Sequence, residues 1–286
     1  MLTVPAPAKL NLTLEVLGER PDGFHEILSV IQTTSLSDRL SFRASDVIEF
    51  KCTSPGWAAE KSLVARATGL LQETTGCSRG VSIEVEKHIP LLSGLGGDSS
   101  DAAAVLCGLN RLWEAGLSTE RLRALAAQLG SDVPFFLYGG TALVEGRGEK
   151  VTPLPTFPHH WIVLVIPSPP VLQGKTKRLY DSLNPVHFTD GKITQRMVET
   201  LKSAGKFTSS FLFNSFEQVA STQFPGLDTC REQMAQAGAT EIHLAGSGPA
   251  LFTLTQDENE AEGLYQRLRQ QGQECYLAET LSAIDR

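Results

Sequence analysis

The sequence predicts an α+β protein with two domains. Its 286 residues suit two domains at roughly 150 residues each. Stretches with apolar residues at every second position are mixed with stretches at helical spacing, which is typical of sheets covered by helices. Three prolines and two histidines interrupt these patterns between residues 153 and 160. We therefore expect domains at 1–152 and 153–286.

Composition supports a folded protein without a general affinity for polyanions. Hydrophobic residues make up 41% of the chain and charged residues 20%, as in ordinary globular proteins. The net charge is −7, so no global positive field attracts nucleic acid or an anionic membrane. We expect a small-molecule partner, no nucleic acid and no membrane. Any anionic ligand must be bound by a local structural feature rather than by the overall charge.

The cysteines and the N-terminus favour a reducing cytoplasm. The first residues lack a basic segment followed by an apolar run, so no targeting segment is predicted. The longest apolar run, residues 161–166, is far shorter than the ~20 residues that cross a bilayer. The five cysteines form no CxxC pair, which argues against a disulfide framework or a zinc site.

In the first half, leucines and Val16 alternate with polar residues over 10–16 and predict a half-buried strand. Its polar side carries Lys9, Asn11 and Thr13. A helix is expected from the Ser62 cap to Gly76. Further strands are expected at 26–32, 39–43 and 81–86, and further helices from Ala102 to Trp113 and after Ser118 to Gly130.

The second half resembles a split βαβ, ferredoxin-like layout. Strands are expected at 161–166, 241–244, 250–255 and 274–279, and helices at about 190–204, 226–237 and 258–271. A glycine loop, residues 245–249, lies between the two central strands.

The segment from Gly94 to Ser100 is the most informative in the chain. Its three glycines allow positive φ and close approach to a ligand. Successive N–H groups, the positive end of the following helix, and the hydroxyls of Ser99 and Ser100 can then bind phosphate.

Other interpretations of this loop exist. It fits a flexible turn with a serine cap. It also fits part of a dinucleotide fingerprint. However, Ser99 replaces the third glycine of that fingerprint, and seven residues separate the preceding strand from the first glycine. It is not a Walker A loop, since no GK[ST] follows.

The pattern Pro90-x-x-x-Gly94-Leu95-Gly96-Gly97-x-Ser99-Ser100-x-Ala102 resembles the phosphate loop of the GHMP kinases, which include galactokinase, homoserine kinase and mevalonate kinase. Residues 7–12 (PAKLNL), 22–26 (DGFHE) and 129–136 (LGSDVPFF) are similar to the members that act on a cytidine diphosphate-linked methylerythritol. Residues 245–249 (AGSGP) resemble the third glycine motif of the family. These motifs occur in the order of the family.

The resemblance implies a two-domain GHMP kinase fold, with a ribosomal-protein-S5-domain-2-like N-terminal domain and a ferredoxin-like C-terminal domain. It implies transfer of the ATP γ-phosphoryl group to the 2-hydroxyl of the polyol, in non-mevalonate isoprenoid biosynthesis. Such transfer depends on positioning and charge neutralisation. Mg²⁺ is expected with ATP, but the sequence indicates no ligands for it.

By the same resemblance, Asp132 would accept the proton of the hydroxyl, and Lys9 would orient Asp132 and keep it ionised. From the sequence alone, a helix cap is the favoured role for Asp132 and an exposed strand position the usual one for Lys9. The residues expected to contact ATP are Pro90, Leu91, Leu92, Ser93, Gly94, Leu95, Gly96, Gly97, Asp98, Ser99, Ser100, Lys87 and Ser62. Asp98 departs from the family, in which glycine is common at this point.

Substrate contacts are expected from Asn11 on the strand, and from Phe24 and His25, which match the pair that reads cytosine. Tyr180 would supply an opposing aromatic face, and Gly246 and Ser247 would also contact the substrate. Without the resemblance, Phe24 could be a core residue and His25 a surface residue.

Three other functions remain open at this point. The chain could be a GHMP kinase for another alcohol, of the homoserine or mevalonate type, but such a substrate has no use for a cytosine clamp. It could be a nucleotide-binding module without catalysis, although the presence of both Lys9 and Asp132 argues against this. A dinucleotide oxidoreductase fits least well. We expect a monomer or weak homodimer.

Overall fold

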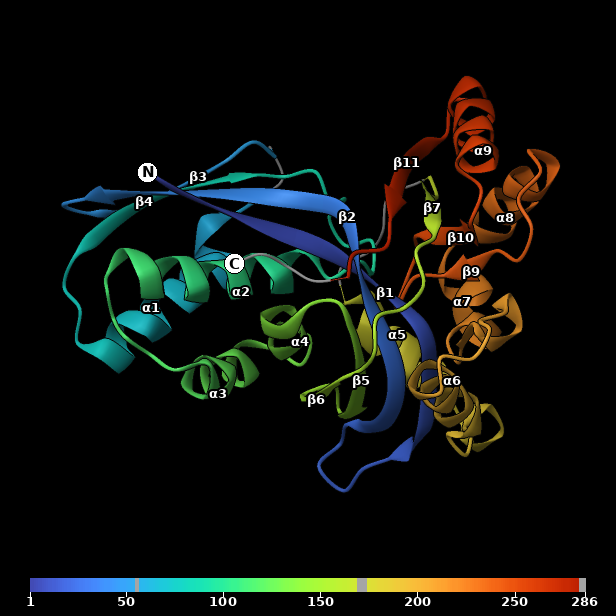
Figure 1. The fold of residues 1–286 in the computed structure, drawn as a ribbon, viewed down its shortest axis with the longest axis horizontal. Helices are drawn as coiled ribbons and strands as arrows, with labels where there is room; N and C mark the ends of the chain where they lie inside the picture. The colour runs from blue at the N-terminus through green and yellow to red at the C-terminus, as the bar shows by residue number, and fades with distance from the viewer. Residues whose placement is uncertain (55–56, 169–173, 283–286) are drawn as a thin grey trace.

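Two β-sheets organise the chain (Figure 1). The computed structural model describes residues 1–54, 57–168 and 174–282. The first sheet has the order β3-β4-β2-β1-β8, and β5 pairs with the first half of β2 and with β6. Its strands are β1 (Leu2–Glu19), β2 (His25–Ser45), β3 (Ile48–Cys52), β4 (Gly80–Glu86), β5 (Thr141–Gly146), β6 (Lys150–Pro153) and β8 (Phe213–Asn214).

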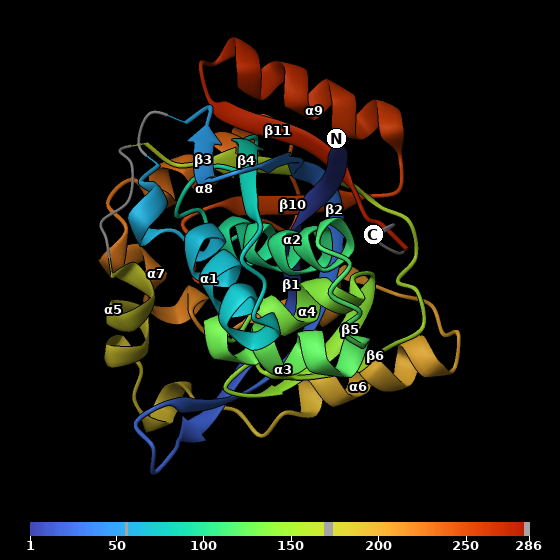
Figure 2. The ribbon, with the colours of Figure 1, turned by 90° about the vertical axis from the view of Figure 1, so that its left-hand side faces the viewer.

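Four helices cover one face of the first sheet (Figure 2). They are α1 (Leu63–Thr75), α2 (Gly97–Leu112), α3 (Thr119–Leu129) and α4 (Val133–Tyr138). Their apolar stripes meet alternate residues of β2 and β4, such as Phe42 and Ile83, in a core. Gly108 of α2 faces the ring of Phe42, and a side chain there would collide with it.

The second sheet has four antiparallel strands in the order β11-β7-β10-β9. These are β7 (Trp161–Ile166), β9 (His243–Leu244), β10 (Leu251–Thr255) and β11 (Glu274–Glu279). Numbered along the chain, the order is 4-1-3-2, so the ferredoxin-like layout is confirmed. The helices of this half are α5 (Lys175–Ser182), α6 (Lys192–Lys202), α7 (Glu217–Gln223), α8 (Leu227–Gln236) and α9 (Glu258–Gln270).

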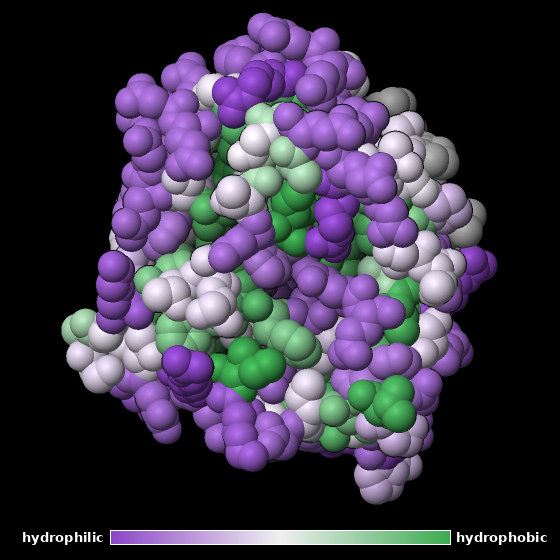
Figure 3. All heavy atoms as spheres, turned by 90° about the vertical axis from the view of Figure 1, so that its right-hand side faces the viewer, coloured by the Kyte–Doolittle hydropathy of each residue, from purple (hydrophilic) through white to green (hydrophobic). Residues whose placement is uncertain are grey.

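Packing between the two halves forms a continuous interior. Leu10 and Leu12 of β1 share a core with Ile162 and Leu164 of β7. On its other side the second sheet contacts α8 and α9, which lie at the right of Figure 1. The short β8, from the second half of the chain, extends the first sheet by pairing in parallel with β1. The face of the molecule at the right of Figure 1 is mainly hydrophilic, with small hydrophobic groups between the polar side chains (Figure 3).

The structure corrects several expectations. The strand at 10–16 is buried on both sides rather than one, because the second half of the chain covers its polar face. Residues 26–32 and 39–43 belong to one strand, β2. The helix expected from Ala102 begins at Gly97, inside the glycine segment. Three 3₁₀ turns (Ala59–Lys61, Pro185–His187 and Ser209–Phe211) complete the described elements.

The described residues include all the cysteines and the helices named above. All five cysteines lie within the described ranges and are free. Among the described helices, none is long and apolar enough to cross a membrane.

Candidate active site

Two adjoining cavities meet at Lys9 and Asp132. The larger, of about 570 Å³, extends to the aromatic residues Phe24, His25 and Tyr180. The smaller, of about 180 Å³, lies against the glycine segment. Five residues line both cavities: Lys9, Ser99, Asp132, Thr176 and Ser247. The arrangement therefore joins an anion-binding loop, a carboxylate and an aromatic compartment in one cleft.

Lys9 is held in place from several sides. Its Nζ lies 3.7 Å from Oδ2 of Asp132 and donates a 2.5 Å hydrogen bond to Oδ1 of Asn11. The amide of Asn11 in turn donates to the hydroxyl of Ser29 on β2, at 2.8 Å. Only 5% of Lys9 is exposed, so it is not the exposed strand lysine that the sequence alone allowed. Asn11 does not line either cavity, and its contacts orient Lys9.

Asp132 directs its carboxylate to the cleft. It lies immediately before α4, but its side chain makes no cap hydrogen bond, and its backbone is already helical. The capping interpretation is therefore wrong for this side chain. The side chain is 39% exposed and pairs only with Lys9 among the described residues. A carboxylate with free acceptor sites is suited to receive a proton from a bound hydroxyl.

The glycine segment is packed between the two halves of the chain. Gly94 and Gly96 have φ of +92° and +75°. A Cβ on Gly94 would lie 2.2 Å from the carbonyl oxygen of Ala245, in the second glycine loop. The two loops are also joined by a hydrogen bond from the Ala250 N–H to the Ser93 carbonyl, at 3.1 Å. Gly94 is thus required for contact between the loops, in addition to any contact with a ligand.

The start of α2 points its free N–H groups into the smaller cavity. Gly96 is the N-cap and supplies no side-chain acceptor, so the first-turn amides keep their donors. Of the residues expected to contact ATP, ten line this cavity: Lys87, Pro90, Leu91, Leu92, Ser93, Gly94, Gly96, Gly97, Asp98 and Ser99. Three do not: Leu95 and Ser100 are fully buried, and Ser62 caps α1 by accepting from the Ala65 N–H.

Asp98 lies at the rim of the cavity. Its side chain is 57% exposed, and Oδ1 lies 3.9 Å from Nζ of Lys87. Solvent and this lysine both weaken its repulsion of a bound anion, which makes a carboxylate tolerable at this point.

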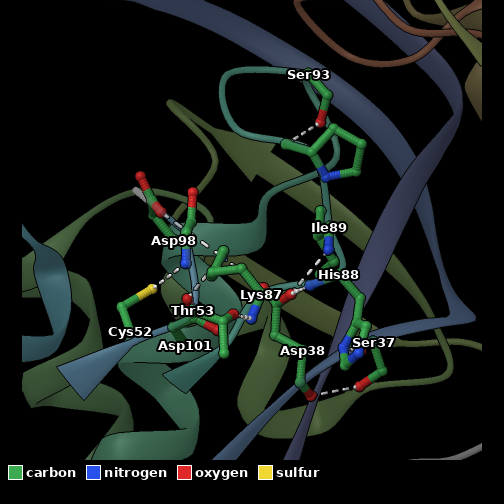
Figure 4. Close-up of polar contacts among 12 residues, drawn as sticks. Ser37, Asp38, Cys52, Thr53, Lys87, His88, Ile89, Ser93, Asp98 and Asp101 are labelled. Carbon is green, nitrogen blue, oxygen red and sulfur yellow. Dashed lines mark hydrogen bonds and ion pairs between the residues drawn. The ribbon is translucent and has the colours of Figure 1, made fainter. Parts of the chain in front are cut away.

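Lys87 is the centre of a buried ion cluster behind the loop (Figure 4). Its Nζ donates to Asp38 at 2.5 Å and to Asp101 at 2.8 Å. Asp38 also accepts the N–H groups of His88 and Ile89, at 2.6 and 2.8 Å, whereas Oδ1 of Asp101 has no partner in the part of the chain that the structure describes. The ammonium is therefore largely occupied within the protein, and the cluster anchors α2 to the end of β4.

Within this cluster Asp101 is the carboxyl whose pKa is raised. Burial raises the pKa of Asp101 to about 7, with Lys87 opposing the shift and Asp38 adding to it. The same two carboxylates outweigh the effect of burial on Lys87 and raise its pKa. One ammonium shared by two buried carboxylates cannot neutralise both.

We predict that Asp101→Asn changes the pH dependence of stability. The folded protein binds a proton at Asp101 more tightly than the unfolded chain, so this group stabilises the fold at low pH. That contribution is lost as the pH rises from about 4 to about 7. Urea unfolding at several pH values should show that the free energy of unfolding of the variant rises relative to that of the wild type over this range. Parallel pH profiles for the two proteins would contradict the prediction.

The far end of the larger cavity is aromatic. The rings of His25 and Tyr180 are stacked, with centroids 4.7 Å apart and an interplanar angle of 25°. Phe24 is 48% exposed, and the guanidinium of Arg147 lies 4.9 Å from the centre of its ring. Phe24 is therefore not the core residue that the sequence alone allowed. Nε2 of His25 is buried and has no hydrogen-bond partner among the described residues, so this nitrogen can donate or accept one hydrogen bond with a ligand.

Tyr180 comes from α5 in the second half of the chain, as expected. The structure places it on His25 itself rather than across an open gap from it. Burial, and the nearby charge of Asp132, raise the pKa of Tyr180, so its phenol stays neutral. Gly246 and Ser247 also line this cavity.

Sequence reasoning missed several residues of the cleft, among them Arg147, Lys175 and Thr176. The signal for the last two is the basic segment that begins at Lys175, in which only Tyr180 was predicted to contact the substrate. Arg147 lies in the turn between β5 and β6, and neither strand was expected.

The carboxylates of the cleft can bind a hard cation only when a bound ligand supplies further oxygens. No group of three metal-binding side chains occurs in the described ranges. Asp98 and Asp132 both line the smaller cavity. Two carboxylates leave most of the oxygen positions around Mg²⁺ to phosphates and water, as is usual for this ion.

Comparison with known families defines the class of protein. The family model described as GHMP kinases N terminal domain matches residues 62–140, and that described as GHMP kinases C terminal matches residues 195–274. The chain belongs to the GHMP kinase family, and the family it resembled in sequence is confirmed. As a member of this family, it is an ATP-dependent kinase.

Individual relatives give a more specific match than the family models. A 4-diphosphocytidyl-2-C-methyl-D-erythritol kinase of Dehalococcoides mccartyi is 51% identical over 285 residues, which covers all of both chains. The kinase of the same name from Symbiobacterium thermophilum is 40% identical, over 98% of this chain and all of its own. A solved 4-(cytidine 5'-diphospho)-2C-methyl-D-erythritol kinase superposes with a TM-score of 0.82 at 34% identity, covering 98% and 99% of the two chains.

The homoserine kinase of Cytophaga hutchinsonii shares the fold, with a TM-score of 0.73 at 20% identity over 99% and 96% of the two chains. The expected two-domain α+β GHMP kinase fold is thereby confirmed.

Proposed function

We propose that the protein transfers the γ-phosphoryl group of ATP to the 2-hydroxyl of 4-diphosphocytidyl-2-C-methyl-D-erythritol, giving ADP and the 2-phosphate. This step belongs to non-mevalonate isoprenoid biosynthesis. The observation that carries the proposal is the meeting of the two cavities at Lys9 and Asp132. Full-length relatives of this name support the choice of substrate.

In this proposal the smaller cavity holds the triphosphate. The amides at the start of α2 and the hydroxyl of Ser99 bind its oxygens. The terminal phosphoryl group then faces the larger cavity, where Asp132 accepts the proton of the hydroxyl and Lys9 neutralises the charge that develops. Mg²⁺, held by the phosphates with Asp98 or Asp132, would supply further neutralisation.

The larger cavity holds the cytidine diphosphate part of the substrate. Phe24 offers an aromatic face to the cytosine, while Tyr180 supports the ring of His25 by stacking on it. His25 offers its Nε2, which has no partner among the described residues, and the adjacent backbone. A substrate such as homoserine has no group that fills this aromatic end. The compartment therefore favours the cytidine-linked polyol over the homoserine or mevalonate type.

Both domains contribute to the site. We propose the division at residues 152 and 153, with the phosphate loop, Lys9 and Asp132 in the first domain. The second domain adds Tyr180, Gly246 and Ser247 to the cleft.

The test is ADP release from ATP and Mg²⁺ with this substrate, compared with homoserine and mevalonate. We predict turnover with the cytidine-linked polyol and competition by CDP. His25→Ala should raise KM for the polyol about 10-fold or more, the usual worth of one or two lost contacts in a closed site, while KM for ATP changes little.

His187→Ala serves as the matched control, since this histidine lies in the exposed turn at Pro185–His187 and does not line either cavity. Turnover with homoserine or mevalonate instead of the cytidine-linked polyol would overturn the choice of substrate. Equal KM values in His25→Ala and wild type would overturn the cytosine site.

A further inference from the structure

Lys175, the first residue of α5, is a buried lysine with no counter-ion among the described residues. Only 7% of it is exposed. Its Nζ donates to the carbonyl and hydroxyl oxygens of Ser247, at 3.0 and 3.1 Å, and to the carbonyl of Gly248. Within the described residues no carboxylate lies within ion-pair distance of it. The oxygens around the ammonium are neutral, so its charge is solvated but not cancelled.

This ammonium lies at the wall of the smaller cavity. The other charged groups that line the cavity are Lys9 from β1, Lys87 after β4, Asp98 at the start of α2 and Asp132 before α4. Asp132 is paired with Lys9, and Lys87 is already held by two aspartates. Lys175 is thus the charge in this cavity that most needs an anionic ligand.

The contacts of Lys175 also join two parts of the cleft. The hydroxyl of Ser247 lies within hydrogen-bond distance of both Lys175 and Thr176, and Ser247 and Thr176 line both cavities. An anion that enters the smaller cavity can therefore replace the serine hydroxyl as a partner of the ammonium, without movement of the backbone.

We propose that Lys175 binds the terminal phosphates of the nucleotide and supplies positive charge that Lys9 alone does not provide. The inference rests on the proposed kinase function, but it concerns nucleotide binding and can be tested without the acceptor. A phosphate oxygen close to a buried ammonium forms a strong charge-assisted hydrogen bond.

The electrostatics of the empty cleft are consistent with this role. Burial, and to a smaller extent the positive charge of Lys9, lower the pKa of Lys175 to about 7. A triphosphate in the cavity opposes both effects and favours the charged form. Nucleotide binding near neutral pH should therefore be accompanied by proton uptake at this side chain.

The experiment is calorimetric titration of the full chain with a non-hydrolysable ATP analogue and with AMP. Lys175→Met should weaken binding of the analogue about 10- to 100-fold, as expected for loss of a charge-assisted hydrogen bond, and leave AMP binding nearly unchanged. Lys175→Arg should retain most of the affinity. Lys192→Met is the matched control, because Lys192 is exposed, pairs with Asp190 and lies outside both cavities.

Two readouts separate phosphate binding from a structural role. In buffers of different ionisation enthalpy at pH 7, wild type should take up about half a proton more per analogue bound than Lys175→Arg, which stays charged. Lys175→Met should unfold at a higher temperature than wild type in the absence of nucleotide, because it removes a buried unpaired charge.

Equal affinity of wild type and Lys175→Met for the analogue would overturn the proposal. So would a loss of affinity that is the same for AMP and for the analogue, or one accompanied by a lower unfolding temperature, since either result indicates a structural role. Failure to phosphorylate the cytidine-linked polyol would overturn the proposed function alone and would leave these binding results valid.

Discussion

Asp132→Asn is expected to lower kcat by about two orders of magnitude or more, with little change in the binding of ATP. Asparagine has nearly the same shape as aspartate but cannot accept the proton of the attacking hydroxyl. A positioned base contributes typically 10²–10⁴-fold to such a step. A tertiary alcohol depends on this help, because it is crowded and very weakly acidic.

The geometry explains why the effect should fall on kcat. The carboxylate of Asp132 makes no cap hydrogen bond and touches only the ammonium of Lys9 among described ionic partners, at 3.7 Å. Its replacement therefore removes no structural contact except this partly exposed pair, which contributes little to stability. The unfolding temperature should change by only a few degrees.

The measurement is a steady-state ADP-release assay together with direct titration of an ATP analogue. Asp190→Asn is the matched control, since Asp190 is an exposed aspartate paired with Lys192 outside the cleft. It should keep wild-type kcat. Turnover in Asp132→Asn within a few-fold of wild type would show that another group accepts the proton.

The sequence predicted the parts of the cleft that short-range chemistry determines. The alternation around Lys9 and the glycine segment each indicate a local structure, and α1, α3, α9 and β7 follow from periodicity and caps. The family resemblance then added what periodicity cannot supply, namely which of these elements meet. The pairing of Lys9 with Asp132 crosses more than a hundred residues and has no local signal.

The errors have a common physical cause. The polar side of β1 looks solvent-facing in sequence, but Asn11, Thr13 and Glu15 are buried because the second half of the chain covers them. Their polar atoms are satisfied largely by tertiary contacts, as in the bond from Thr194 N–H to Glu15 at 2.7 Å. The alternation shows that the two faces of the strand differ in polarity. It does not show whether a second domain also buries the polar face.

Lys87 and Lys175 show the same limit for charge. Both are lysines near the phosphate loop, and only Lys87 was expected to contact ATP. In the structure Asp38 and Asp101 largely occupy Lys87, while the acceptors of Lys175 among the described residues are all neutral. Which cation is available to a ligand depends on where carboxylates lie in space, and Asp38 is far from Lys87 in sequence.

Gly94→Ala is expected to reduce both activity and stability strongly. The added Cβ would lie 2.2 Å from the Ala245 carbonyl oxygen and 2.8 Å from the Gly248 nitrogen, and both are backbone atoms that cannot turn away. The residue also has φ of +92°, where alanine is strained. Overpacking and backbone strain together should cost about 2–5 kcal/mol of unfolding free energy.

The activity loss follows from separation of the two glycine loops. To make room for the methyl group, the loops must move apart, which breaks the hydrogen bond between Ser93 and Ala250. Gly246 lies on the same contact: a Cβ added to it would meet the Gly94 carbonyl oxygen at 2.8 Å and Lys9 Nζ at 3.1 Å, so the movement also disturbs Lys9. A shift of about 1 Å in a phosphoryl-transfer site can lower the rate about 100-fold.

Gly116→Ala separates the contact between the loops from the effect of backbone conformation. Gly116 has φ of +65° and nothing within 4 Å of an added Cβ, and it lies far from the cleft in the turn between α2 and α3. It should lose only about 1–2 kcal/mol, the usual cost of a left-handed alanine, and keep full activity. Equal losses of stability in the two variants, with activity retained in Gly94→Ala, would show that the loops do not depend on this contact.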